Sequence, residues 1–178
     1  MELITNYNDK TIKLRTATAD DVDYLLKWWN DGEIMEHAGF PLGLNTTAEK
    51  VQKSIAKSSE VYQLLIMEFE GIPFGEMTFS IENNVADFGI KICVKTLRNK
   101  GVGPVVLKAL FQYLFDLGVE KICCDTNPNN ARARHFYENK MGMKQVKIKE
   151  NCWTNQLGEP QGIVFFEITK EEFENNKN

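Results

Sequence analysis

The alternation of apolar and polar residues near the start of the chain predicts a strand followed by a helix. Within Lys10–Ala17, Ile12 and Leu14 alternate with charged residues, which is the period of a half-buried strand. Thr18 is a typical N-cap residue, and Asp21 follows it in the first turn of the helix that we expect there. The apolar face of this helix has helical spacing and comprises Val22, Leu25, Leu26 and Trp29.

Farther along, the pattern predicts a loop, a second helix and a β-hairpin. Glycine and proline make residues 33–45 partly loop, and Thr46 or Thr47 can cap a helix that runs to about Lys57. The β-like runs Val61–Phe69 and Ile72–Ile81 are joined by Glu70-Gly71, which is a hairpin turn sequence. This region therefore changes from helical to strand-like periodicity.

The second half of the chain alternates between strands and helices. After a turn at Asn83-Asn84 we expect a strand at Val85–Val94, a helix at Pro104–Leu117, a strand at Val119–Asp125, a helix at Asn130–Asn139, and strands at Met143–Lys149 and Gln161–Thr169. The charged tail after about Lys170 looks detachable from the rest. The order predicts a mixed α/β fold in which a hairpin meander precedes a strand–helix–strand crossover.

Composition and charge narrow the class of protein. The 178 residues are 43% hydrophobic, and no repeat or linker divides them, so we expect a single domain over residues 1–178 with its core at about 10–170. The net charge of −4 argues against nucleic-acid binding. No signal-peptide core and no run of about 18 apolar residues is present, which predicts a cytoplasmic protein without membrane contact. The four cysteines form no CxxC pair, so no metal is expected.

The segment Arg98-Asn99-Lys100-Gly101-Val102-Gly103 is the most informative motif for chemistry. It joins a predicted strand to a predicted helix, where unpaired amides and the helix dipole favour an anion and glycine allows close approach. The order Lys-Gly-Val-Gly excludes a Walker A loop, and Val106 occupies the position of the third glycine of a dinucleotide motif. A phosphate cradle and a plain tight turn into a helix remain as the two interpretations.

A second motif downstream carries a family resemblance. The loop Arg-x-x-Gly-x-Gly is followed by Asn130, Ala133 and Tyr137 in the order Asn-x-x-Ala-x-x-x-Tyr. Together these motifs resemble the GCN5-related N-acetyltransferase (GNAT) family, which transfers the acetyl group of acetyl-CoA to an amine. The similarity runs from about Ala86 to Val146, and a weaker similarity is found at Leu14–Asp31.

The resemblance implies a fold and a branch of the family. The implied fold is that of acyl-CoA N-acyltransferases, with a mixed, mostly antiparallel central sheet and flanking helices. Residues Leu25–Asp31 and Phe88–Ile92 are similar to the branch that holds ribosomal-protein N-terminal, polyamine and aminoglycoside acetyltransferases.

The resemblance also implies a binding site for acetyl-CoA. The amides of the glycine loop would hold the pyrophosphate with charge from its basic residues, the strand before it would offer backbone groups to pantetheine, and Asn130 would contact the same arm while capping its helix. Pro104 departs from this pattern because it lacks an N–H. The residues expected at the cofactor are Ile92, Cys93, Val94, Arg98, Asn99, Lys100, Gly101, Val102, Gly103 and Asn130.

Three residues are candidates for proton transfer. By resemblance Tyr137 would be the general acid that protonates the departing CoA thiolate, although a core tyrosine is the alternative. The general base would be Asp87 or Glu76, and each can instead be a solvated charge on a strand. No sequence feature supports a covalent role for Cys93, so we expect direct attack of the amine in a ternary complex.

The acceptor pocket is expected near the first helix and the loop after it. Trp28 lies off the apolar face and could line the pocket, whereas Trp29 fits the core. Glu36 and His37 lie in the loop, where carboxylates can hold a cationic acceptor or can simply be solvated.

The sequence therefore predicts an acetyl-CoA-dependent N-acetyltransferase that acts on a small-molecule or peptide amine. The resemblance leaves a homodimer open. The alternatives are a non-catalytic acyl-CoA-binding sensor and a transferase that uses another acyl-CoA.

Overall fold

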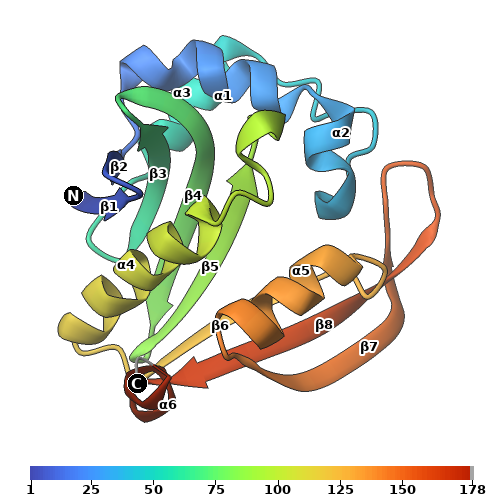
Figure 1. Ribbon diagram of the computed structural model, residues 1–178. Helices are drawn as coiled ribbons and strands as arrows, with labels where there is room; N and C mark the ends of the chain where they lie inside the picture. The colour runs from blue at the N-terminus through green and yellow to red at the C-terminus, as the bar shows by residue number, and fades with distance from the viewer. Residues whose placement is uncertain (177–178) are drawn as a thin grey trace.

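The computed structural model describes residues 1–176, in which eight strands form a single sheet of order β1-β2-β3-β4-β5-β6-β8-β7 (Figure 1). All neighbours are antiparallel except β5 and β6. The strands are β1 (Glu2–Tyr7), β2 (Lys10–Thr16), β3 (Tyr62–Phe69), β4 (Ile72–Glu82), β5 (Val85–Ile92), β6 (Lys121–Thr126), β7 (Lys144–Thr154) and β8 (Pro160–Thr169). The expected mixed, mostly antiparallel α/β fold is confirmed.

Helices cover both faces of the sheet. The α-helices are α1 (Val22–Trp29), α2 (Gly32–Met35), α3 (Ala48–Ile55), α4 (Val102–Asp116), α5 (Ala131–His135) and α6 (Lys170–Asn175). Short turns of other helix types are η1 (Ala19–Asp21), η2 (Glu36–Ala38), η3 (Lys95–Leu97) and the π-helical turn η4 (Phe136–Lys140). Helix α4 crosses one face of the strands in Figure 1.

Each face of the sheet is covered by its own apolar cluster. The larger cluster joins α4, α6 and η4 to one face of the sheet, with Phe88, Phe111 and Phe166 among its buried members. The smaller cluster packs Leu25 and Trp28 of α1 and Val51 of α3 against the other face. Because side chains alternate along a strand, neighbouring residues of β5 belong to opposite faces.

The sheet opens between β5 and β6. These strands pair only where Val85–Asp87 lies beside Lys121–Cys123. Beyond this point β5 follows β4 to Ile92, whereas β6 follows β8 to Thr126. The two halves of the sheet therefore diverge like the arms of a V, as Figure 1 shows.

The structure corrects several sequence expectations. Strand β1 was missed, and the helix expected at Asn130–Asn139 is a short α5 that continues into the π-helical turn. The tail after Lys170 is not detachable within the described residues: it forms α6, whose Phe173 is 3% exposed and packs on Phe111 and Phe115. No helix within residues 1–176 is long and apolar enough to span a membrane.

Candidate active site

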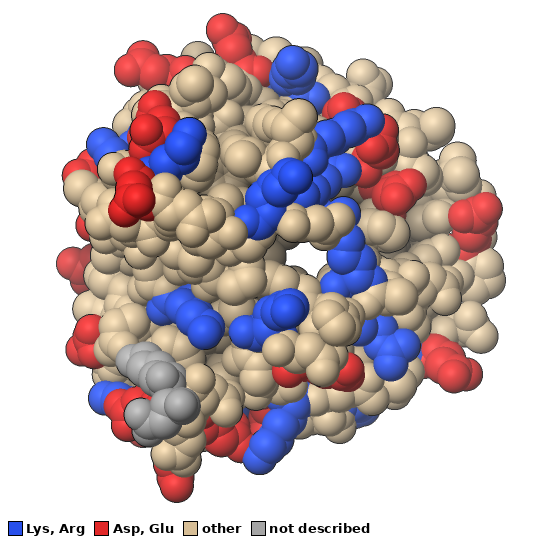
Figure 2. All heavy atoms as spheres, in the orientation of Figure 1, with Lys and Arg blue, Asp and Glu red and all other residues tan. Residues whose placement is uncertain are grey.

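The V between β5 and β6 holds a cleft of about 790 Å³. Its walls come from α2 and η2, the end of β5, the start of α4, the end of β6, and α5 with η4. Figure 2 shows an opening through the molecule with lysine and arginine side chains around it. The charged side chains that line the cleft are Glu33, Glu36, Lys91, Arg98, Asp125, Arg132 and Lys140.

The start of α4 presents unpaired backbone amides. Gly101 has φ +84°, and an added Cβ there would lie 2.5 Å from the hydroxyl of Tyr7, which itself donates to the carbonyl of Lys100 at 2.5 Å. The glycine is therefore required both for its backbone conformation and for space. Within residues 1–176, no acceptor is found for the amides of residues 99–101, and first-turn amides have no partner inside a helix.

The same loop brings a cation to the cleft. Arg98 donates from Nε to the carbonyl of Ile92 at 2.9 Å, and its Nη1 lies 3.7 Å from a carboxylate oxygen of Glu33. The side chain is 17% exposed, so these two contacts hold its direction. Unpaired amides, two glycines and an oriented guanidinium fit a phosphate-bearing ligand.

Not every residue expected at the cofactor lines the cleft. Ile92, Arg98, Asn99, Gly101, Gly103 and Asn130 do, whereas Cys93, Val94, Lys100 and Val102 do not. The amides of Cys93 and Val94 both donate to the carbonyl of Phe74, at 2.9 and 3.0 Å. These two amides are therefore already paired with β4, so they are not among the backbone groups that this strand can offer to a ligand.

Two other expected residues have structural contacts of their own. Asn130 is the N-cap of α5, and its Oδ1 accepts from the amide of Ala133 at 3.1 Å. The Cys93 side chain belongs to the cluster under α1, where burial raises the pKa of its thiol well above the ordinary value. A thiol in this state is a poor nucleophile, in agreement with the expectation that Cys93 forms no covalent intermediate.

Tyr137 lies at the floor of the cleft within the π-helical turn. It is 6% exposed, and its ring contacts those of Phe88, Phe136 and Phe166. Burial, followed by the electrostatic interactions with Cys124 and Asp125, raises the pKa of the phenol well above its ordinary value of 10. The hydroxyl therefore stays protonated at neutral pH and can act only as a proton donor or hydrogen-bond partner.

Two carboxylates flank the point where the sheet opens. Asp125, at the end of β6, lines the main cleft, and partial burial raises its pKa. Asp87 lies opposite Cys123 and lines a separate pocket of about 300 Å³. Partial burial and the charge of Asp125 raise the pKa of Asp87 to about 6.

Glu76, the other carboxylate expected to act as a base, is bound on both oxygens. Its Oε1 accepts from Nζ of Lys91 at 2.8 Å, and its Oε2 accepts from Nε1 of Trp29 at 2.7 Å. The residue is 2% exposed and does not line the cleft, whereas Lys91 does. Burial alone would lower the pKa of Lys91, but the interaction with Glu76 raises it above its ordinary value, so Lys91 is a charged ammonium at neutral pH.

The pocket-lining role expected for Trp28 is wrong. Trp28 is 5% exposed and packs in the cluster under α1, so it does not line the cleft. Trp29 is partly buried and reaches Glu76. The face of α1 that packs on the sheet contains Leu25 and Trp28, so the buried face of this helix differs from the one expected from helical spacing.

The loop after α1 contributes to the cleft and is joined to the β7–β8 hairpin. Glu36 and His37 line the cleft, and Nε2 of His37 lies 3.3 Å from Oε1 of Glu36. Gln156, in the hairpin, donates its backbone amide to Gly39 and its side-chain amide to Gly43, and accepts from the amide of Leu42. These three hydrogen bonds connect the two arms of the V at its open end.

A sequence profile described as an acetyltransferase (GNAT) domain matches residues 11–144. The chain belongs to the GNAT acetyltransferase family. Comparison of this acetyltransferase with curated proteins gave no significant match.

Solved structures show the same fold as this acetyltransferase. Aminoglycoside acetyltransferase AAC(6')-Ib in complex with coenzyme A is 25% identical, with a TM-score of 0.74 over 94% of this chain and 99% of that one. RimL, a ribosomal L7/L12 α-N-protein acetyltransferase in complex with coenzyme A, has a TM-score of 0.81 at 14% identity, over 94% and 98% of the chains. Spermidine N-acetyltransferase from Vibrio cholerae, in complex with coenzyme A and spermine, has a TM-score of 0.80 at 18% identity, over 91% and 97%.

Two features at or near the acetyltransferase cleft, Asp125 in it and Gln156 beside it, were not predicted from the sequence. Asp125 was expected only as the last residue of a strand, although an acidic residue at a strand end is a usual site residue. Gln156 lies in a loop with no motif, and its partners lie more than a hundred residues away in the chain. Only the folded structure brings these groups together. Among residues 1–176, no three metal-ligating side chains are grouped to hold an ion.

Proposed function

We propose that this acetyltransferase transfers the acetyl group of acetyl-CoA to a primary amine by direct attack in a ternary complex. The observation that carries the proposal is that Asn99 and Gly101, whose amides have no acceptor within residues 1–176, line the same cleft as Tyr137 and Asp125. The solved relatives include acetyltransferases named for an aminoglycoside, for the α-amine of a ribosomal protein and for spermidine. Each of these names refers to an acceptor that carries an amine.

The loop before α4 would bind the pyrophosphate of coenzyme A. Its amides and the α4 dipole favour negative charge, and Arg98 and Lys100 add positive charge at the same place. Gly103 lets α4 pack closely against β5 and η4, because an added Cβ would lie 3.3 Å from the side chain of Ile92 and 3.4 Å from that of Phe136. Pro104 removes one donor from this turn, so the remaining amides carry the binding. When bound, acetyl-CoA supplies the activated acetyl thioester.

Tyr137 would donate the proton from its hydroxyl to the departing thiolate sulfur. Its raised pKa disfavours early ionisation, so the proton moves only as negative charge develops on the sulfur. The aromatic rings around Tyr137 fix its orientation and exclude water from the floor of the cleft. The phenol would return to its protonated form by accepting the proton that the amine has released.

The carboxylate of Asp125 would take the proton from the attacking amine, and Asp87 would act on it from the neighbouring pocket. Asp125 lines the cleft, and Asp87 influences it electrostatically from the neighbouring strand. Partial burial raises the pKa of both carboxylates toward the working pH, that of Asp87 to about 6, and a general base is most effective when its pKa is near that pH. Glu76 is a weaker candidate, because Lys91 and Trp29 occupy both of its oxygens.

The test is release of free coenzyme A from acetyl-CoA in the presence of a panel of amines, with acetylated products identified by mass spectrometry. We expect amine-dependent release with product acetylated on nitrogen. Tight binding of acetyl-CoA without turnover of any amine would contradict the proposal and support a non-catalytic sensor. Faster turnover with a longer acyl-CoA would identify a different acyl donor.

A further inference from the structure

Lys91 lies on the face of the sheet that is opposite to α4. Ile90 and Ile92 pack against the cluster under α4, whereas Cys93 packs in the cluster under α1. Because side chains alternate along β5, Lys91 shares the face of Cys93, and its partner Glu76 contacts Trp29 of α1. If α4 binds the phosphates of coenzyme A, Lys91 faces the side from which the acceptor must come.

Only part of the hydrogen-bonding capacity of Lys91 is used. An ammonium has three donors, and within residues 1–176 the Lys91 Nζ is found to donate only to Glu76. The Lys91 side chain is 31% exposed and lines the cleft, while the Glu76 side chain behind it is 3% exposed. The pair is therefore oriented, with its negative end buried and its positive end toward the cleft.

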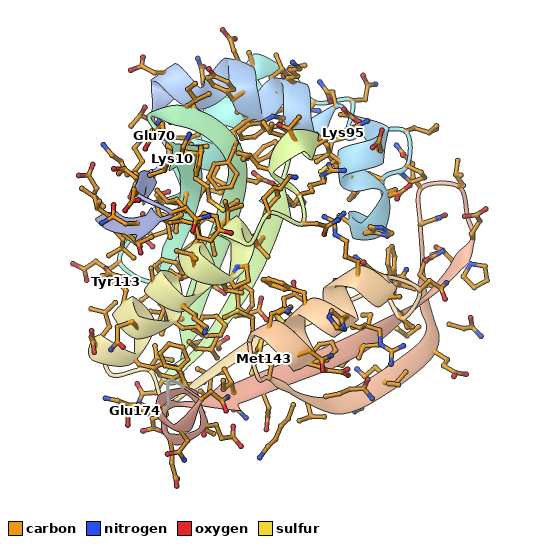
Figure 3. The ribbon with its side chains drawn as sticks, viewed as in Figure 1. Lys10, Glu70, Lys95, Tyr113, Met143 and Glu174 are labelled. Atoms are coloured by element: carbon orange, nitrogen blue, oxygen red, sulfur yellow. The ribbon has the colours of Figure 1, made fainter. Side chains whose placement is uncertain are left out.

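The acidic side chains near this face are already engaged. The Asp31 carboxylate caps α2 by accepting from the amides of Glu33 and Ile34. Glu33 pairs with Lys95 at 2.6 Å and lies 3.7 Å from Arg98; Figure 3 labels Lys95 beside α2. A polycation would find Glu36 next to His37, but no cluster of free carboxylates on this wall within the described residues.

We infer that Lys91 binds an anionic group of the acceptor, so that the acceptor is an amine that also carries a carboxylate rather than a polycation. This inference rests on the proposed amine acetyltransfer. The same chemistry is found in a free amino acid and in a peptide that begins with an acidic residue. Lys91 is in this scheme a specificity residue, and the carboxylate of Asp125 in the cleft remains available for the amine.

The experiment compares matched amines that differ only in one carboxylate. Alanine against alaninamide tests a free amino acid, and C-terminally amidated peptides that begin with Asp or Asn test a peptide. For the preferred source, we expect kcat/KM to be about 10-fold or more higher for the carboxylate than for its amide, as a charge-assisted hydrogen bond would give. Spermidine and kanamycin serve as polycationic probes.

Variants show whether Lys91 is responsible. Lys91→Met alone leaves the Glu76 carboxylate buried and unpaired, so the double variant Lys91→Met/Glu76→Gln is also needed; its glutamine can still accept from Trp29. We expect the double variant to bring the carboxylate-to-amide ratio close to 1. Lys121→Met is the matched control, because Lys121 is also on a strand and pairs with a carboxylate, Glu167 at 3.1 Å, but lies outside the cleft.

A second readout does not depend on turnover. Calorimetry of acceptor binding to the protein loaded with coenzyme A should show the same carboxylate preference, and the double variant should lose it. The inference is overturned if a polycation has the highest kcat/KM, or if the ratio persists in the double variant. If no amine is acetylated at all, the proposed function fails and the inference fails with it; acetylation without carboxylate preference removes the inference alone.

Discussion

The two walls of the cleft are built in different ways. The α4 wall is made from consecutive residues, 98–103, and presents backbone amides whose direction follows from a glycine at φ +84°. What we call the α1 wall is Lys91 of β5, which lines the cleft, together with the Glu76 and Trp29 side chains behind it, which do not line the cleft and are joined to Lys91 by the hydrogen bonds from Trp29 and Lys91 to Glu76. A main-chain site for a common ligand can therefore be local in sequence, whereas the acceptor wall depends on tertiary contacts.

The walls also differ in how they handle charge. The α4 wall attracts anions with partial charges that need no counter-ion. The α1 wall contains a formal charge pair, in which desolvation of Glu76 must be offset by Lys91 and Trp29. Substitutions on the first wall should therefore change ligand binding, and substitutions on the second should change stability and acceptor choice.

The largest effect is expected at the floor between the walls. Tyr137→Phe removes the proposed acid but keeps the ring contacts with Phe88 and Phe166, so we expect kcat to fall by about 100-fold to 10,000-fold. The Kd of acetyl-CoA should change little. Steady-state kinetics and calorimetry measure the two quantities, and Tyr113→Phe on α4 is the control. An unchanged kcat would remove Tyr137 from the mechanism.

Next in size is the stability of the α1 wall. Lys91→Met should lower the free energy of unfolding by about 3 kcal/mol, the low end for breaking a buried pair, because Lys91 is itself partly open to solvent. Adding Glu76→Gln should restore most of this loss, because no buried charge then lacks a partner. Urea denaturation of the wild type and both variants measures the effect. Equal stability of the single and double variants would show that the pair is not coupled.

On the α4 wall, Gly101→Ala should raise the Kd of acetyl-CoA about 10-fold or more, equivalent to about 1.4 kcal/mol. The added Cβ would meet the Tyr7 hydroxyl at 2.5 Å, so the loop and its amides must shift. Gly118→Ala is the matched control, since Gly118 also has a positive φ, +93°, but no atom within 4 Å of the added Cβ. If both variants bind acetyl-CoA equally well, the position of the loop does not control binding.

The smallest effect is a shift in pH dependence. Because the pKa of Asp87 is about 6, above its ordinary 3.8, we expect kcat/KM to fall as the pH drops below about 6 and the carboxylate pair takes up a proton. Asp87→Asn removes the repulsion within the pair and should move this acid limb to lower pH. A pH–rate profile for each protein shows the shift, and an unchanged limb would exclude Asp87 from the titration.

The same pKa has a consequence for stability with a definite sign. The folded protein binds the Asp87 proton more tightly than the unfolded chain between about pH 4 and 6. The contribution of Asp87 to stability is therefore present at pH values below about 4 and is lost as the pH rises to about 6. Thermal unfolding of the wild type and Asp87→Asn over this range measures it, and parallel curves would contradict it.

The success of prediction from the sequence differs between the same two walls. Periodicity and turns predict most strands and helices, and the spacing from Gly101 to Tyr137 predicts the cofactor side, because these features depend on neighbouring residues. The position of Trp28 was predicted wrongly, since helical periodicity alone does not say which residues of α1 the sheet buries. The α6 helix could have been found from Thr169 and Glu172, which form a capping box.

The remaining features of the site are determined by contacts between segments that are far apart in the sequence. Nothing near Gln156 in the sequence indicates that it bridges to Gly39 and Gly43. The pairing of Lys91 with Glu76 requires the register of β4 and β5, which places the two residues opposite each other. Such features depend on the register and the twist of the whole sheet.

The most direct measurement is a crystal structure of the protein with coenzyme A. It should show the pyrophosphate on the amides of residues 99–103 and the sulfur in the cleft near Tyr137, with Lys91 on the opposite side of the opening. A pyrophosphate bound away from the start of α4, or a sulfur that does not enter the cleft between β5 and β6, would contradict the proposed active site.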